Sequence, residues 1–372
     1  MLLLWIIFSF AGICFVVTGA NYLFWPRIRE EYSDYPGGVS VLIPARNEEQ
    51  NLSACLEQII KQGSVIAEVL VYDDYSVDNT PYIIQSYASQ HAFIKLVPPV
   101  PLRPNWCGKP FACAQLAAAA SGEWLLFLDA DARLRPNAIR RMLTEAQARQ
   151  VTFLSCWPGF EMKTWAEKIL MPLLNFVVFS LYPAPLSLSR RAEFQQNPNI
   201  GLAHGACLLF ERKSYEEFGG HEQVKDQIFE DTRLAQLWRA SRRVGICLDG
   251  QDIVTVRMYL SFREIWFGFQ KNFFPAFQKE SIFWLFLLLH GGVFLTPFLL
   301  ALTTQAPLLL MTCVLVLLAR LLLVLRFKHS LLSVIFHPLG EVILLLLGLS
   351  SWWRCKMGRG VAWKGRTYQK SA

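Results

Sequence analysis

Two long stretches without a charged residue limit what this chain can fold into. Residues 1–26 and 281–319 carry no Lys, Arg, Asp or Glu, whereas residues 27–280 hold an ordinary mixture of charged, polar and apolar types. An uncharged apolar run of about 20 residues is long enough to cross a membrane as a helix. The sequence therefore predicts a soluble domain bracketed by membrane segments, and it excludes a disordered chain, collagen or a disulfide miniprotein.

The first apolar run, Leu2 to Trp25, also has the length of a secretory signal peptide. It lacks a basic start, however, and its end offers no small-residue cleavage site, so we favour an uncleaved anchor. Arg27 and Arg29 follow it directly. Because Lys and Arg are enriched on the cytoplasmic side of membrane helices, we expect a multi-pass protein of the cell inner (cytoplasmic) membrane whose soluble domain faces the cytoplasm.

The C-terminal apolar segments cover residues 282–303, 306–327 and 331–353. Three full crossings would place the basic tail, residues 354–372, outside the cell. That tail holds six Lys or Arg and no acid, which favours contact with anionic lipid on the cytoplasmic side. Together with His337, Gly340 and Glu341 inside the last segment, this pattern favours a segment that is re-entrant or lies in the interface.

The soluble part alternates short apolar runs with stretches of helical periodicity. Strands are predicted over residues 38–44, 68–72, 93–97 and 124–128, and helices over 48–62, 81–89 and 109–121. This alternation is typical of an α/β domain with a largely parallel sheet. Because ligands collect at the carboxyl ends of such strands, the acidic residues that follow them mark the candidate site: Asp73, Asp74, Asp129 and Asp131.

The pair Asp129 and Asp131 follows the fourth strand as an Asp-x-Asp motif. Two carboxylates in an extended turn suit Mg²⁺ or Mn²⁺ and leave positions open for phosphate oxygens, although a solvated turn would look the same. Residues 43–49 leave the first strand and open a helix whose N–H groups could face an anion. Lys109 could offer its charge to a phosphate or be an ordinary surface lysine.

Glu230 and Asp231 begin a further predicted helix. One of them could act as a general base, or both could simply complement the helix N-terminus. The chain contains neither a dinucleotide-binding Gly motif nor a P-loop, and its nine scattered cysteines form no C-x-x-C pair. Because the basic residues cluster beside the membrane segments, we expect no nucleic-acid partner.

Four ordered motifs, at 41–49, 71–80, 127–131 and 230–231, resemble those of family 2 inverting glycosyltransferases over residues 38–280. The resemblance implies a nucleotide-diphospho-sugar transferase domain of the GT-A type. Within the family, the segments 106–109, 182–183, 204–206 and 363–368 look most like membrane-bound enzymes that glycosylate carotenoid acids, the diaponeurosporenoate glycosyltransferase type, and hopanoid-associated glycosyltransferases. The Q-x-x-R-W motif of processive members is absent, which argues against a polymer synthase.

The resemblance also implies roles for individual residues. Asp231 matches the catalytic base, with Glu230 beside it, and Asp129 and Asp131 match the motif that holds the ribose and the diphosphate-bound Mg²⁺ or Mn²⁺. The nucleotide-sugar pocket is expected to involve Pro44, Ala45, Glu48, Asp73, Asp74, Lys109 and Asp129.

These observations predict five regions: an anchor (1–26), a cytoplasmic glycosyltransferase domain (38–255), an interfacial amphipathic region (256–280), C-terminal membrane segments (281–353) and a basic tail (354–372). The expected reaction moves a hexose, with UDP-glucose as the expected donor, to a hydrophobic acceptor such as a carotenoid, hopanoid or other lipid. Apolar residues over 165–185 and 259–277 predict two interfacial helices. The alternatives are a membrane-tethered nucleotide-sugar-binding protein without turnover, and a nucleotidyltransferase.

Overall fold

The computed structural model describes residues 1–35, 38–189, 191–277, 279–357, 361–363 and 366–368. The basic residues Arg359, Lys364 and Lys370 of the predicted tail lie outside this part of the chain. The chain forms two compact units. An α/β unit consists of Pro26–Glu161 and Leu186–Met258, and a helical unit consists of Met1–Trp25, Met162–Pro185 and Tyr259–Ala372.

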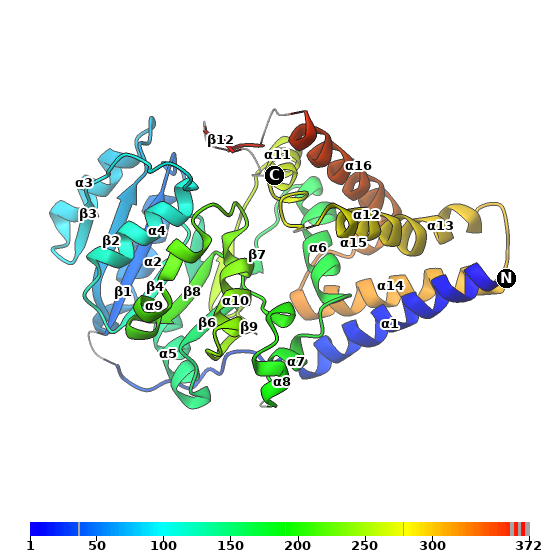
Figure 1. Cartoon of the computed structure of the whole chain (residues 1–372), viewed down its shortest axis with the longest axis horizontal. Coiled ribbons are helices and arrows are strands. Elements are labelled where there is room, and N and C mark those ends of the chain that lie inside the picture. The colour runs from blue at the N-terminus through cyan, green and yellow to red at the C-terminus, as the bar shows by residue number, and fades with distance from the viewer. Residues whose placement is uncertain (36–37, 190, 278, 358–360, 364–365, 369–372) are drawn as a thin grey trace. The chain divides into compact units, whose positions relative to one another are not determined.

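A seven-stranded sheet with the order β3-β2-β1-β4-β8-β6-β9 forms the centre of the α/β unit (Figure 1). In this sheet β8 runs antiparallel to β4 and β6, and the remaining neighbours are parallel, so the expected mostly parallel sheet is confirmed. The strands are β1 Val39–Ala45, β2 Ile66–Asp73, β3 Ile94–Val97, β4 Trp124–Leu128, β6 Phe153–Trp157, β8 Cys207–Glu211 and β9 Gly245–Asp249.

Neighbouring residues of these strands point to opposite faces of the sheet and enter two separate cores. In β1, Val41 and Ile43 belong to one core and Leu42 to the other, and all three are fully buried. Burial on both faces explains why the strands are apolar throughout. The surrounding helices are α2 Leu52–Ile60, α3 Thr80–Gln90, α4 Gly108–Ala119, α5 Ala138–Arg149, α8 Ala192–Gln195, α9 Arg212–Phe218 and α10 Glu230–Ala240.

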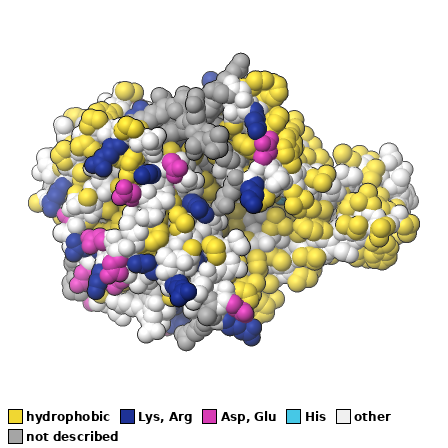
Figure 2. Space-filling model, viewed as in Figure 1, with side chains coloured by type: hydrophobic (Ala, Val, Ile, Leu, Met, Phe, Trp, Pro, Cys, Tyr) yellow, Lys and Arg dark blue, Asp and Glu magenta, His cyan; other side chains and the backbone are white. Residues whose placement is uncertain are grey.

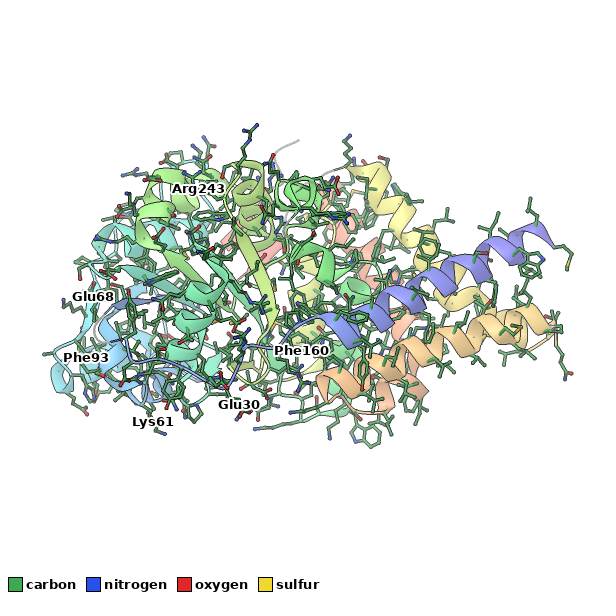
Figure 3. All side chains as sticks on the ribbon, turned by 90° about the horizontal axis from the view of Figure 1, so that it is seen from below. Glu30, Lys61, Glu68, Phe93, Phe160 and Arg243 are labelled. Atoms are coloured by element: carbon green, nitrogen blue, oxygen red, sulfur yellow. The ribbon has the colours of Figure 1, made fainter. Side chains whose placement is uncertain are left out.

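Smaller elements complete the α/β unit. A three-stranded sheet joins β5 Ala132–Leu134, β10 Val254–Val256 and β7 Gly159–Phe160. Single 3-10 turns cover Gly63–Val65, Pro198–Ile200 and Gly220–Val224. Glu68, labelled in Figure 3, lies near the start of β2 and accepts hydrogen bonds from Ser40 and Ser121, far along the strands from their carboxyl ends. The acidic loops predicted to bind ligand lie at the other end of these strands.

The helical unit contains three stretches that are long and apolar enough to cross a membrane: Leu2–Phe24, Glu280–Ala301 and Pro307–Phe327. Its exposed surface is dominated by hydrophobic side chains, whereas charged side chains are scattered over the α/β unit (Figure 2). The elements are α1 Leu2–Phe24, α6 Trp165–Phe179, α11 Phe262–Asn272, α12 Glu280–Leu289, a π-helix His290–Leu295, α13 Thr296–Ala301, α14 Pro307–Phe327, α15 Leu332–Ile335, α16 His337–Lys356, and the strands β11 Val361–Trp363 and β12 Arg366–Tyr368. The short helix α7 Ala184–Ser187 begins in this unit and ends in the α/β unit.

Helix α6 is continuous through Pro172. It also buries Leu170, Phe176 and Phe179 inside the helical unit, so the expected interfacial position is wrong for this helix. Asn21 of α1 explains part of this, because its side chain donates to the carbonyl oxygens of Phe179 and Tyr182 and thereby fixes the end of α6.

A buried arginine links three elements of the helical unit. The guanidinium group of Arg320 in α14 donates to the carbonyl oxygens of Pro172 in α6 (3.2 Å) and Ser333 in α15 (2.7 Å). It also lies over the ring of Phe176, 5.0 Å from the centroid. These contacts satisfy backbone carbonyls that have no access to water.

Replacing Arg320 with Met is expected to lower the free energy of unfolding by about 2 kcal/mol, because hydrogen bonds from a charged donor are lost while two carbonyls stay buried. The measurement is the unfolding midpoint of the purified chain in detergent. Arg191→Met is the matched control, since the side chain of Arg191 is 78% exposed. Equal midpoints for both variants would contradict the expectation.

Candidate active site

The reversed direction of β8 assembles the candidate site. Because β8 is antiparallel to β4, its first residue, Cys207, pairs with Leu128 at the carboxyl end of β4. The residues before β8 therefore reach the Asp-x-Asp turn, and the N–H of Asp129 donates to the carbonyl oxygen of Ala206 (3.1 Å). The segment 204–206 thus lies at the same edge of the sheet as Asp129.

Lys109 connects two of the predicted site segments. It lies in the first turn of α4, and its ammonium is 2.8 Å from Oδ1 and 3.1 Å from Oδ2 of Asp129. The same ammonium is 3.1 Å from Oε1 of Glu230, in the first turn of α10. Burial alone would lower the pKa of Lys109, but the carboxylates of Asp129 and Glu230 outweigh it and hold this pKa well above its usual value.

Asp231 is held by backbone N–H groups instead of a cation. Gly205 donates to Oδ2 (2.6 Å) and Thr232 donates to Oδ1 (2.7 Å). Burial, reinforced by the neighbouring carboxylate of Glu230, raises the pKa of Asp231 to about 7. A carboxylate with such a pKa can accept a proton near neutral pH, whereas Glu230 has its charge engaged by Lys109.

The ends of β1 and β2 form a second part of the site. Ala45 pairs with Asp73 in the sheet, after Pro44, which pairs with Tyr72. The N–H of Asp74 donates to the carbonyl oxygen of Ala45 (2.8 Å). Asp73 and Asp74 are both at least nine-tenths buried. Arg46 donates to the carbonyl oxygen of Asp74, so these adjacent strand ends are tied into one rigid edge.

The expected anion site at residues 43–49 is wrong in its detail. Helix α2 begins only at Leu52, and the N–H groups of residues 47–49 before it already have partners. Glu48 donates its N–H to Thr80 Oγ1 (2.8 Å), and Asn47 donates to Ser76 Oγ (2.8 Å). These bonds join the loop after β1 to the loop after β2, and they leave the carboxylate of Glu48 to accept from Asn51 Nδ2 (3.0 Å).

The chemistry of the Asp-x-Asp turn fits a hard divalent cation. Asp129 and Asp131 supply carboxylate oxygens, the ligands that Mg²⁺ and Mn²⁺ prefer. Among the described residues, no group of three or more His, Cys, Asp or Glu side chains is arranged to hold a metal. A cation bound here would therefore take further ligands from a diphosphate or from water.

The sequence did not predict how two residues, His204 and Gly205, contribute to the geometry of the site. His204 lies beside Trp157 with ring centroids 5.2 Å apart, and burial, aided by the charge of Lys109, lowers its pKa to about 3, so its ring is neutral. Gly205 supplies the N–H that holds Asp231. The only signal for segment 204–206 in the sequence was its resemblance to family 2 glycosyltransferases. Its local sequence pattern does not show that it lies beside Asp231.

Gly205 has no room for a side chain. A Cβ atom at this position would lie 3.0 Å from Lys109 Nζ and 3.2 Å from Asp231 Oδ2. Gly205→Ala is therefore expected to displace both groups and to lower the initial rate of catalysis by about 100-fold, as small misplacements of catalytic groups do. Gly12→Ala is the control, since no heavy atom lies within 4 Å of its Cβ. Equal rates for both variants would contradict the conclusion that a side chain at position 205 displaces Lys109 and Asp231.

Comparison with known proteins points to the same class as the sequence motifs. Residues 40–219, slightly less than half of the chain, match the model of the glycosyl transferase family 2. Among curated proteins, the 4,4'-diaponeurosporenoate glycosyltransferase of Staphylococcus aureus is 26% identical over 263 residues, which cover 67% of this chain. The match covers 66% of the length of that relative, slightly less than two thirds.

Solved structures show the same fold. The mannosyltransferase PcManGT from Pyrobaculum calidifontis, in complex with GDP-Man and Mn²⁺, superposes with a TM-score of 0.52 at 18% identity and covers 93% of this chain and 99% of its own. The chain therefore has a GT-A-like glycosyltransferase fold, as its motifs predicted.

Proposed function

We propose that this protein transfers a hexose from a nucleotide-diphosphate sugar to a hydrophobic membrane acceptor. The observation that carries the proposal is the constellation of Asp231, held by two backbone N–H groups, with the Asp129–Lys109–Glu230 network beside it. Three helices of membrane-spanning length favour an acceptor that resides in the lipid phase. The relative that is named for a carotenoid acid supports a polyene or similar lipid.

In this proposal Asp231 accepts the proton of the acceptor hydroxyl as the acceptor oxygen bonds to the anomeric carbon. The bond from that carbon to the diphosphate oxygen breaks on the opposite side, so the anomeric configuration inverts. Asp129 and Asp131 would hold the divalent cation, which when bound neutralises the departing diphosphate. Glu230 keeps Lys109 in place instead of acting as the base. A carboxylate acceptor would already be ionised and would need Asp231 mainly for positioning.

The first test uses membranes that contain the full chain and radiolabelled UDP-glucose, with other labelled nucleotide sugars in parallel. Carotenoid and hopanoid lipids are supplied as acceptors. Label that enters the organic phase, requires a divalent metal and falls steeply with Asp231→Asn would support the proposal. Absence of label with every donor, while the purified chain still binds a nucleotide sugar, would instead favour a binding protein without turnover.

The rate of transfer to an alcohol acceptor is expected to depend on pH with a midpoint near 7. The pKa of Asp231 is raised to about 7, so the carboxylate is the dominant form above this pH and the protonated acid below it. Because only the carboxylate accepts a proton, activity should fall as the pH drops through 7 and level off above it. The measurement is kcat/KM between about pH 5 and 9; a flat profile through neutrality would contradict the assignment.

We also propose that the chain crosses the membrane three times and that its last segment is re-entrant. Arg326, at the end of α14, donates to the carbonyl oxygen of Tyr22 (3.1 Å), near the end of α1. From there the chain reaches His337, which contacts the carbonyl oxygen of Phe294 (3.0 Å) partway along the second span. Helix α16 then returns, and Lys356 is 2.7 Å from Glu280, at the beginning of that span.

In this topology the end of α16 lies on the same side of the membrane as the start of α12. With Arg27 and Arg29 as cytoplasmic markers, that side is the cytoplasm. Single cysteines at Met357 and at Thr304, introduced into a cysteine-free background, would test it with an impermeant thiol reagent applied to intact cells. Labelling at 304 and protection at 357 support the proposal; labelling at 357 would overturn it.

Helix α11 supports an interfacial region near residues 256–280. Its start is capped by Ser261, which accepts from the N–H of Glu264 (3.2 Å). Phe262 and Phe267 are nearly half exposed, and the guanidinium of Arg263 lies 5.8 Å from the centre of the Phe267 ring. Exposed aromatic rings beside a basic residue are typical of helices that lie in the headgroup layer.

A further inference from the structure

A divalent cation that bound Asp129 would have to share the carboxylate of this residue with Lys109. Its ammonium contacts both carboxylate oxygens of Asp129, at 2.8 and 3.1 Å, and one oxygen of Glu230. Two cations that share one carboxylate repel each other strongly at such distances. In the absence of substrate, the ammonium of Lys109 already neutralises the carboxylate of Asp129, so this carboxylate attracts a divalent ion only weakly.

The protein supplies few other ligands for a metal at this point. In the described part of the chain, no three His, Cys, Asp or Glu side chains come together as a metal site. Asp131 adds one carboxylate to that of Asp129, whereas Mg²⁺ and Mn²⁺ commonly take six ligands. A diphosphate brings both the missing oxygen ligands and additional negative charge.

We propose that Lys109 is a positioning residue that makes metal binding depend on the nucleotide. Its ammonium keeps Asp129 and Glu230 neutralised and in place while the site is empty, so the divalent ion binds stably only together with the diphosphate of the donor. The diphosphate then offers Lys109 a second anionic partner. This inference rests on the proposed function, because it assumes a nucleotide-diphosphate sugar as the donor.

The geometry around Gly205 links this role to the catalytic base. A Cβ at Gly205 would lie 3.0 Å from Lys109 Nζ and 3.2 Å from Asp231 Oδ2, so the backbone at Gly205 packs closely against both groups. Glu230 adjoins Asp231 in the first turn of α10. The position of Lys109 is therefore coupled to that of the base through Glu230 on one side and Gly205 on the other.

The test measures Mn²⁺ binding to the purified full-length chain by electron paramagnetic resonance, with and without UDP, at about pH 8, where exposed carboxylates are ionised. Wild type is expected to bind Mn²⁺ at least about tenfold more tightly with UDP than without it. Lys109→Met should raise the affinity for Mn²⁺ alone by about tenfold or more, because uncompensated carboxylates remain. Lys109→Arg, which keeps the positive charge, should bind Mn²⁺ alone as weakly as wild type does.

Lys95→Met is the matched control. Lys95 pairs with Glu68 at 3.2 Å, near the start of β2, and its side chain is 57% exposed. This variant should bind Mn²⁺ as wild type does. Circular dichroism of each variant checks that the fold is retained.

Two results would overturn the proposal. The first is that wild type binds Mn²⁺ tightly without nucleotide and that UDP does not increase this affinity. The second is unchanged Mn²⁺ binding in Lys109→Met. If Lys109→Met gains affinity but UDP, GDP and dTDP all fail to promote Mn²⁺ binding in wild type, the exclusion of metal by Lys109 stands and the proposed donor class falls.

Discussion

Replacing Asp231 with Asn is expected to lower the initial rate of sugar transfer to an alcohol acceptor by about 100- to 10,000-fold, the usual contribution of a general base. The amide cannot take up the proton, although its oxygen can still accept one of the two backbone hydrogen bonds that Asp231 receives from Gly205 and Thr232. The substitution also removes a buried carboxyl whose raised pKa shows that burial disfavours its charge. The fold should therefore tolerate it.

The measurement compares kcat and kcat/KM with labelled donor and saturating acceptor. Asp226→Asn makes the same chemical change at an exposed position, where the carboxylate accepts from Gln227 Nε2, and should leave the rate unchanged. A loss below about threefold with an alcohol acceptor would rule out Asp231 as the base. With a carboxylate acceptor a smaller loss is expected, since no proton has to be removed.

Replacing Asp131 with Asn is expected to abolish most of the metal-dependent rate, by about 100-fold or more, because a metal that stabilises the leaving group contributes several kcal/mol to the transition state. Asp131 lies in the turn between β4 and β5, two residues after Asp129. Adding more Mn²⁺ should recover only part of the loss.

The measurement is the rate of transfer as a function of Mn²⁺ concentration at fixed donor. Asp34→Asn is the control, since the side chain of Asp34 is 93% exposed. If Asp131→Asn keeps the Mn²⁺ dependence of wild type, the Asp-x-Asp turn does not hold the metal. Loss of the rate with unchanged nucleotide binding in the absence of metal would locate the defect in the metal site itself.

The strands and their order along the chain were accessible to sequence reasoning, because each is a short apolar run with a turn or an acidic group at its end. The predicted strand 124–128 matches β4, and the first three predicted strands agree with β1, β2 and β3 to within two residues. Local patterns of this kind need no knowledge of distant contacts. The beginning of α10 at Glu230 also follows from its acidic first turn.

Other features depended on contacts between residues far apart in the chain. The prediction of an interfacial helix over 165–185 is wrong for α6, because an apolar helix has the same sequence pattern whether lipid or protein covers it. The helix expected to begin at Glu48 starts later, because side chains of the 76–80 loop take the N–H groups of Asn47, Glu48 and Glu49.

By itself the sequence determined that the chain has apolar stretches of membrane-spanning length, an alternating α/β unit, and carboxylates at the ends of its strands, since charge and periodicity are local properties. Tertiary structure alone decided that the antiparallel β8 carries Gly205 to Asp231, and that Lys109 joins Asp129 to Glu230. These pairings arise from how strands and helices pack, and a distance of about 3 Å between groups on separate elements leaves no trace in the local pattern of either.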